Sequence, residues 1–115
     1  MSELRSRTKR FAVAIFQFCE KLPGEPFCKV IRPQLMRSAL SIGANYSAGC
    51  HAQSRAEFLA KMALAEEEAD ETEYWPELLD DLQHAPEAPL RNLRDEAHQI
   101  TPMIVASVKT ARGKQ

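Results

Sequence analysis

The sequence is poor in glycine and cysteine. Only 4 of its 115 residues are Gly and 3 are Cys. Few glycines among many Ala, Leu, Glu, Arg and Lys residues favour helices over sheets. Cys19, Cys28 and Cys50 are odd in number, lie far apart and form no CxxC pair, so neither a disulfide framework nor a zinc site is indicated. A reducing cytoplasm fits this cysteine usage best.

Long apolar runs are also missing. No stretch approaches the roughly 18 apolar residues that a membrane span needs, so we expect no membrane partner. The basic RSRTKR segment followed by FAVAIFQFC resembles a signal peptide. However, Gln17 interrupts its apolar part, Glu20 and Lys21 follow it, and no small-residue cleavage site is present. We therefore do not expect this segment to act as a signal peptide.

Charge of one sign does not dominate either. The net charge is -1 and the pI about 6.3, which argues against a protein that binds nucleic acid with its whole surface and leaves room for a local basic patch. A chain of 115 residues predicts a single domain over residues 1–115, too short for a two-domain enzyme with a cofactor fold.

Apolar residues recur at spacings of three and four in four segments, which is the periodicity of amphipathic helices. In the first segment, Thr8 is the one polar residue at a position of the apolar stripe. The four stripes are Leu4, Phe11, Ile15, Phe18 and Leu22; Leu35, Ala39, Ile42 and Tyr46; Phe58, Met62, Ala65, Ala69, Thr72 and Leu79; and Leu90, Leu93, Ala97, Ile100 and Ile104.

Helix boundaries follow from the residues that start and stop helices. Pro23 and Gly24 end the first segment, and Pro33 predicts that the second helix starts near it. Ser54 followed by Glu57 forms a capping box at the start of the third. The breaker-rich stretch 84–89 precedes the fourth.

Proline also occurs inside two predicted helices. Pro76 and Pro102 should each kink or shorten the helix that contains them, because proline removes a backbone donor and crowds the preceding turn. Four amphipathic helices with short connections predict an all-α fold, an antiparallel up-down-up-down four-helix bundle.

Two helices carry more apolar or small residues than a solitary bundle needs. Small residues repeated every four positions allow another helix to approach closely. We therefore predict an interface between copies of the chain, although these side chains could also simply face water. The predicted interface consists of Met36, Leu40, Gly43 and Ser47 in the second helix and Leu64, Trp75, Leu78 and Leu82 in the third.

A polar line lies on the other shoulder of the second helix. Ser41 and Asn45 need hydrogen-bond partners if they are covered, and need none if they face water. Glu68 and Glu71 interrupt the second apolar line of the third helix and could bond to Arg37 or to the Ser41 and Asn45 line. We call these five residues the polar lock, and we predict that it fixes the register of the two helices.

Cationic residues gather near both termini and near the connection between the second and third helices. In an up-down-up-down bundle these parts share one end. Repeated in an oligomer, they are candidate contacts for RNA or single-stranded DNA, or they merely keep the ends soluble. The basic end comprises Arg5, Arg7, Lys9, Arg10, Arg55, Lys109, Arg112 and Lys114.

Candidates for catalysis are weak. Asp95 and His98 are the nearest approach to the Glu-x-x-His pairs of di-iron bundles, but their positions face away from the apolar stripe and no second pair exists. Cys50 beside His51 is the only candidate nucleophile and base, and an idle thiol explains it better. The sequence predicts no enzyme, no catalytic residue, no metal and no cofactor.

The run from Gln34 to Leu79 resembles the bacterial four-helix bundle protein family. That family includes proteins encoded in intervening sequences of large-subunit ribosomal RNA genes, and an accessory protein of diversity-generating retroelements is a relative. Ala48 stands where the family usually has Glu, and Pro76 replaces an ordinary helix residue. The matching residues are Gln34, Arg37, Ser41, Ile42, Asn45 and Gly49, then Ser54, Phe58, Ala65, Glu68, Glu71, Thr72, Tyr74 and Trp75.

The resemblance implies a left-handed antiparallel bundle that assembles with itself, typically as a pentameric ring, and it implies no enzyme. We therefore expect a cytoplasmic homo-oligomeric scaffold or adaptor. The alternative is a nucleic-acid-binding accessory protein that uses the basic end of the ring. The retroelement relatives are strongly basic and this chain is not, so their role transfers poorly.

Overall fold

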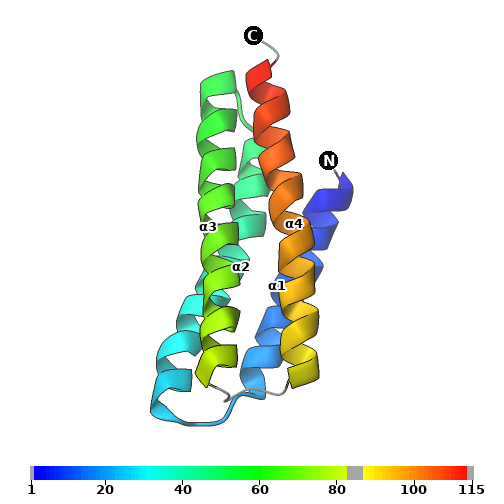
Figure 1. The fold of residues 1–115 in the computed structure, drawn as a ribbon. Helices are drawn as coiled ribbons and strands as arrows, with labels where there is room; N and C mark the ends of the chain where they lie inside the picture. The colour runs from blue at the N-terminus through cyan, green and yellow to red at the C-terminus, as the bar shows by residue number, and fades with distance from the viewer. Residues whose placement is uncertain (1, 83–86, 114–115) are drawn as a thin grey trace.

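Four helices that alternate in direction make up the described chain (Figure 1). The structure is a computed structural model that describes the backbone of residues 2–82 and 87–113 and the side chains of residues 3–82 and 88–110. The helices are α1 (Ser2–Glu20), α2 (Pro26–Cys50), α3 (Arg55–Leu82) and α4 (Glu87–Gly113). They form an elongated antiparallel bundle of 48 × 20 × 20 Å, which confirms the predicted fold class.

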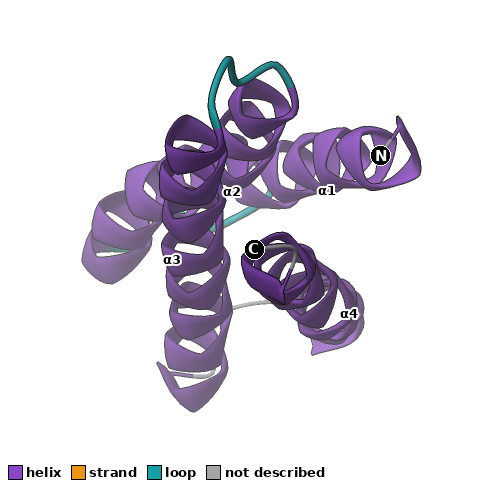
Figure 2. Cartoon of the chain, turned by 90° about the horizontal axis from the view of Figure 1, so that it is seen from above, coloured by secondary structure: helices purple, strands orange, loops and turns teal. Residues whose placement is uncertain are grey.

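Each helix packs against two neighbours. α1 contacts α2 and α4, and α3 also contacts α2 and α4, while the diagonal pairs do not touch within the described residues. α2 and α3 share the most extensive contact, and α1 and α4 the least. Seen from above, α1 points away from the bundle axis toward its N-terminus (Figure 2). The bundle therefore has a close-packed side and a splayed side.

The predicted apolar stripes form the core. Every stripe residue of α1, α2 and α4 is buried, and so are those of α3 except Phe58, which is half-buried. Thr8 and Thr72 are fully buried, and their hydroxyls donate to the carbonyls of Arg5 and Glu68 at 2.9 and 2.7 Å. Both buried polar groups are therefore satisfied within their own helices.

The start of α3 has the predicted cap. The Ser54 hydroxyl accepts a hydrogen bond from the backbone N–H of Glu57 at 3.1 Å. The Glu57 carboxylate in turn accepts one from the backbone N–H of Gln53, also at 3.1 Å. The first bond satisfies a backbone donor that the helix start leaves without a partner and confirms Ser54 as the N-cap. The second bond comes from Gln53, one residue before the N-cap, whose own N–H is the donor in a standard capping box.

The start of α2 corrects a prediction. The helix begins at Pro26, whose fixed backbone angle suits a first helical position, and not near Pro33. This adds almost two turns, and Cys28 and Ile31 on them are buried. Pro33 is exposed, so the carbonyl that its ring deprives of a partner lies on the outer side of the helix.

The prolines inside α3 and α4 do not end these helices. α3 continues past Pro76 to Leu82, and α4 continues past Pro102 to Gly113, so the expectation of shortening is wrong. The apolar stripe explains this result, because Leu79 and Ile104 are fully buried beyond the prolines. Pro76 itself is buried, so its ring contributes to the core.

Candidate interaction surfaces

The predicted polar lock lies between α2 and α3. Arg37 donates to the carboxylate of Glu68 at 3.0 Å and to that of Glu71 at 2.6 Å. The hydrogen bond with Glu71 is the main cause that raises the pKa of Arg37. The Asn45 amide donates instead to the Ser41 carbonyl of its own helix at 2.9 Å. Arg37 thus joins the two helices, whereas the bond of the Asn45 amide stays within α2.

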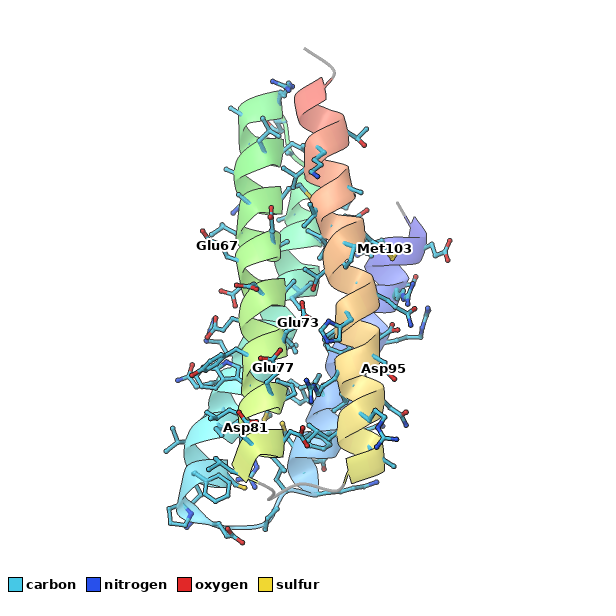
Figure 3. All side chains as sticks on the ribbon, viewed as in Figure 1. Glu67, Glu73, Glu77, Asp81, Asp95 and Met103 are labelled. Carbon is cyan, nitrogen blue, oxygen red and sulfur yellow. The ribbon has the colours of Figure 1, made fainter. Side chains whose placement is uncertain are left out.

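An arginine also joins α1 to α4. Arg7 donates two hydrogen bonds of 2.9 Å to the Glu96 carboxylate and one of 2.5 Å to the Gln99 side chain. It also contacts the sulfur of Met103, on the side of α4 toward α1 (Figure 3). The bond from Arg7 is the largest of the effects that hold the pKa of Glu96 below its usual value. This clamp spans the pair of helices with the least contact.

Two further arginines bind the remaining helix pairs. Arg32 on α2 donates to the carbonyls of Cys19, Leu22 and Pro23 at 2.9, 3.0 and 3.3 Å, and so caps the C-terminal end of α1. Between α4 and α3, Arg94 pairs with Asp80 at 3.0 Å. Nearby, Glu73 accepts a hydrogen bond from the Thr101 hydroxyl at 2.8 Å and lies 2.6 Å from His98 Nδ1. The titratable groups between the helices are therefore largely bonded to one another.

Part of the predicted interface between copies lies beside α1 of the same chain. A Cβ atom on Gly43 would meet the Thr8 hydroxyl at 3.2 Å, and the Ser47 hydroxyl accepts a bond from Arg5 at 2.9 Å. Gly43 and Ser47 therefore face α1 of the same chain, which corrects their assignment. Small residues at this spacing do allow a close helix, but that helix is α1.

The other predicted interface residues divide into two groups. Met36, Trp75 and Leu78 are half-buried and pack against the core. Leu40, Leu64 and Leu82 remain exposed, at 51%, 42% and 39%. Three other large apolar side chains are at least as exposed as Leu82 among the described residues, namely Val13, Val30 and Tyr74.

Trp75 combines a packed ring with an unsatisfied donor. Its ring meets that of Tyr74 edge to face, with centroids 5.1 Å apart. Its Nε1 is buried without a hydrogen-bond partner among the described residues. Burying such a donor costs stability, and the packing of the ring offsets that cost.

The basic end divides in a similar way. The two termini and the connection between α2 and α3 lie toward the same end of the bundle, as expected (Figure 1). Arg5 and Arg7 are engaged by Ser47 and Glu96, while Lys9, Arg10, Arg55 and Lys109 are exposed. The side chains of Arg112 and Lys114 lie outside the described residues.

Two of the three cysteines are buried. Cys19 is fully buried, and burial raises the pKa of its thiol to about 11, so the thiolate that acts as a nucleophile is scarce at neutral pH. Burial likewise raises the pKa of Cys28. Beside Cys50, the His51 ring lies 2.9 Å from the Ser47 carbonyl and is bonded to its own helix.

Neither a cluster of metal-ligating side chains nor a helix that could span a membrane occurs in the described part of the chain. Within residues 3–82 and 88–110, no three metal-ligating side chains gather into a site. His98 pairs with Glu73, whereas Asp95 is exposed on α4. Among the described residues, no helix combines the length and the apolar character that crossing a bilayer requires.

Charge is distributed unevenly among the helices. The acidic run of the third helix is evident in the sequence, whereas the absence of acidic residues from α2 was missed. α2 contains Lys29, Arg32 and Arg37 and no acidic residue, and a helix-by-helix count would have revealed the contrast. Ten of the sixteen acidic residues belong to α3, namely Glu57, Glu66, Glu67, Glu68, Asp70, Glu71, Glu73, Glu77, Asp80 and Asp81.

These observations define an all-α bundle protein whose notable features are its surfaces and the arginine bonds between its helices. The chain belongs to the 23S rRNA-intervening sequence protein family, whose model matches residues 2–106. This confirms the resemblance found in the sequence.

A solved structure from Bacteroides thetaiotaomicron, a protein with unknown function from the S23 ribosomal protein family, has the same fold. It is 32% identical to this chain, with a TM-score of 0.86, over 94% of this chain and 96% of that one. No curated protein matches the sequence.

Proposed function

We propose that the protein is a non-enzymatic cytoplasmic scaffold or adaptor that acts as a homo-oligomer, a ring of five copies. The exposed apolar side chains of α2 and α3 are the main support for this proposal. Leu40, Leu64, Tyr74 and Leu82 are each between 39% and 54% exposed on a chain of only 13.0 kDa. Covering such side chains in a second copy removes apolar surface from water.

The bonded state of the polar groups supports a binding role over catalysis. Arg7, Arg37 and Arg94 each hold a carboxylate of a neighbouring helix. A general base or nucleophile needs a free partner within reach of a substrate, and these pairs are committed to the bundle. The exposed surface is therefore the part of the molecule that is available to a partner.

Light scattering tests the assembly. We expect the mass of five chains for the wild type. Leu40→Glu and Leu64→Glu should each lower this mass, because they place a charge where apolar contact is proposed. Ala106→Glu adds the same charge on an exposed position of α4 and serves as the control. A wild type that scatters as one chain at high concentration would contradict the proposal.

The exposed cations at the basic end favour a second candidate function, the binding of RNA or single-stranded DNA. Lys9, Arg10 and Lys109 are all exposed there. Phosphate contacts by such residues weaken as the salt concentration rises. We expect retention of a labelled oligonucleotide that falls with salt and is lost in an Arg10→Glu/Lys109→Glu variant.

The control for nucleic-acid binding is Lys21→Glu, which reverses an exposed charge in the connection between α1 and α2, at the opposite end of the bundle. Arg7 is left unchanged, because its loss would break the bond to Glu96 on α4. Equal retention by the wild type and by the Arg10→Glu/Lys109→Glu variant would exclude this role for the basic end.

A further inference from the structure

We propose that copies of the chain join head to tail through two different surfaces of opposite charge. A cationic face over α1 and α2 of one copy binds the acidic outer face of α3 of the next copy. This inference rests on the proposed homo-oligomer and names the surfaces that meet in it. The cationic face consists of Lys9, Val13, Lys29 and Leu40, and the acidic face of Leu64, Glu67, Tyr74, Asp81 and Leu82.

Contacts inside the bundle locate the cationic face. Gly43 lies against Thr8, so this side of α2 borders α1. Leu40, Met36 and Lys29 continue the line from Gly43 at spacings of three, four and seven residues, which keeps them on the same side of a helix. Leu40 is 51% exposed there, half-buried Met36 lies beside it, and Lys29 is exposed.

α1 supplies the other edge of this face. Arg5 bonds to Ser47 of α2, and Lys9 lies one turn further along the same side of α1. Lys9 is exposed, and the nearby Val13 is 57% exposed. α2 has no acidic residue, and the nearest acids, Glu3, Glu20 and Glu25, lie near the ends of α1 and in the connection to α2, so positive charge dominates along the length of the face.

The acidic face follows the outer side of α3. Leu64, Glu67, Tyr74 and Asp81 recur at spacings of three and seven, on a line well away from the buried stripe. Leu64 and Tyr74 are 42% and 54% exposed. Glu67 and Asp81 project from α3 as does Glu77 between them (Figure 3). No cation follows Lys61 within the helix, so negative charge dominates.

Charge complementarity selects the pairing. Two cationic faces repel each other, as do two acidic faces, whereas one of each attracts and brings apolar side chains together. α1 and α3 are diagonal and make no contact within the described residues, so one copy presents both faces at once. A contact between two different surfaces can close into a ring of any number of copies, including five.

Charge reversal in two separate variants tests the pairing. The first variant, Lys9→Glu/Lys29→Glu, reverses the cationic face, and the second, Glu67→Lys/Asp81→Lys, reverses the acidic face. All four residues are exposed, so both variants should keep the helical circular dichroism of the wild type. Each variant alone should need at least about tenfold more protein to assemble, because its two faces now carry like charge.

Mixing the two variants gives the decisive measurement. An equimolar mixture should assemble in light scattering at a concentration at which neither variant assembles alone, since the two variants meet through faces of opposite charge. Because two alternating variants cannot fill a ring of five, the mixed assembly should hold an even number of copies or stay open. Lys109→Glu and Asp95→Lys reverse exposed charges on α4 and should assemble as the wild type does.

The failure of this inference is distinct from that of the proposed function. A wild type that is always a single chain overturns the homo-oligomer and the pairing together. A wild type that assembles, with both variants assembling equally well alone, overturns only the pairing. Folded variants that stay apart when mixed also overturn it.

Discussion

The contact between α2 and α3 differs from that between α1 and α4. At the first, Gly49 lets α2 approach α3 so closely that a Cβ there would collide with the end of the Met62 side chain. At the second, α1 inclines away from the bundle (Figure 2), and Arg7 bonds across to Glu96 of α4 at 2.9 Å. One contact is made mainly by apolar packing, and the other depends more on a polar clamp.

Side-chain size explains this difference. Small residues on the facing stripes of α2 and α3, such as Ala39, Ala65 and Ala69, allow the two helices to pack closely. α1 instead buries the larger side chains Phe11 and Phe18. A long arginine spans the wider gap that results.

The largest predicted loss of stability compares how tightly the α2–α3 and α1–α4 contacts are packed. Met62 is fully buried against α2, and Met62→Ala should lower the free energy of unfolding by ~2–5 kcal/mol. Leu4→Ala, near the free end of α1, should cost no more than about 2 kcal/mol, the lower end of that range, because the splayed helix can close over the lost volume. Urea unfolding followed by circular dichroism measures both changes. Equal losses would show that the splayed side is packed as rigidly as the other.

A smaller effect concerns the clamp between α1 and α4. Arg7 lowers the pKa of Glu96 in the folded protein, so the pair stabilises the fold above the pKa of an unfolded Glu, ~4.3. That stabilisation is lost as the pH falls through the lower, folded-state pKa. Glu96→Gln should therefore be less stable than the wild type at pH 7, and the difference should shrink toward pH 3.

Urea unfolding of both proteins at several pH values tests this dependence. Asp95→Asn, on an exposed neighbour that Arg7 does not contact, is the control and should leave the pH profile unchanged. A stability difference between wild type and Glu96→Gln that is constant from pH 7 to pH 3 would show that the ionised pair does not hold α1 in place.

The sequence predicts the core of this bundle well and its polar contacts unevenly. Heptad spacing identified the buried stripes because burial requires one continuous apolar side on each helix. The capping box at Ser54 was predictable since both partners lie within four residues. The bond between Arg7 and Glu96 joins residues 89 positions apart, and no local pattern signals it.

The wrong predictions arose from local signals with two meanings. Proline usually marks a helix start, but Pro33 is exposed in the second turn after the true start at Pro26. The repeat of Gly43 and Ser47 correctly indicates a close helix, yet it cannot tell whether that helix belongs to the same chain. Only the packing of α1 decides this.

The smallest effect tests whether the close-packed side also relies on a polar bond. Arg37 is 47% exposed and Glu68 20%, so water weakens their attraction. A double-mutant cycle with Arg37→Ala and Glu68→Ala should give a coupling of about 0.2–1 kcal/mol that decreases in high salt. The same cycle on Arg94 and Asp80 is the matched comparison, because that pair is more exposed at its carboxylate. Simple additivity for Arg37 and Glu68 would mean that this pair has no measurable role in stability, and the bond from Arg37 to Glu71 would be left as the polar contact of the lock between α2 and α3.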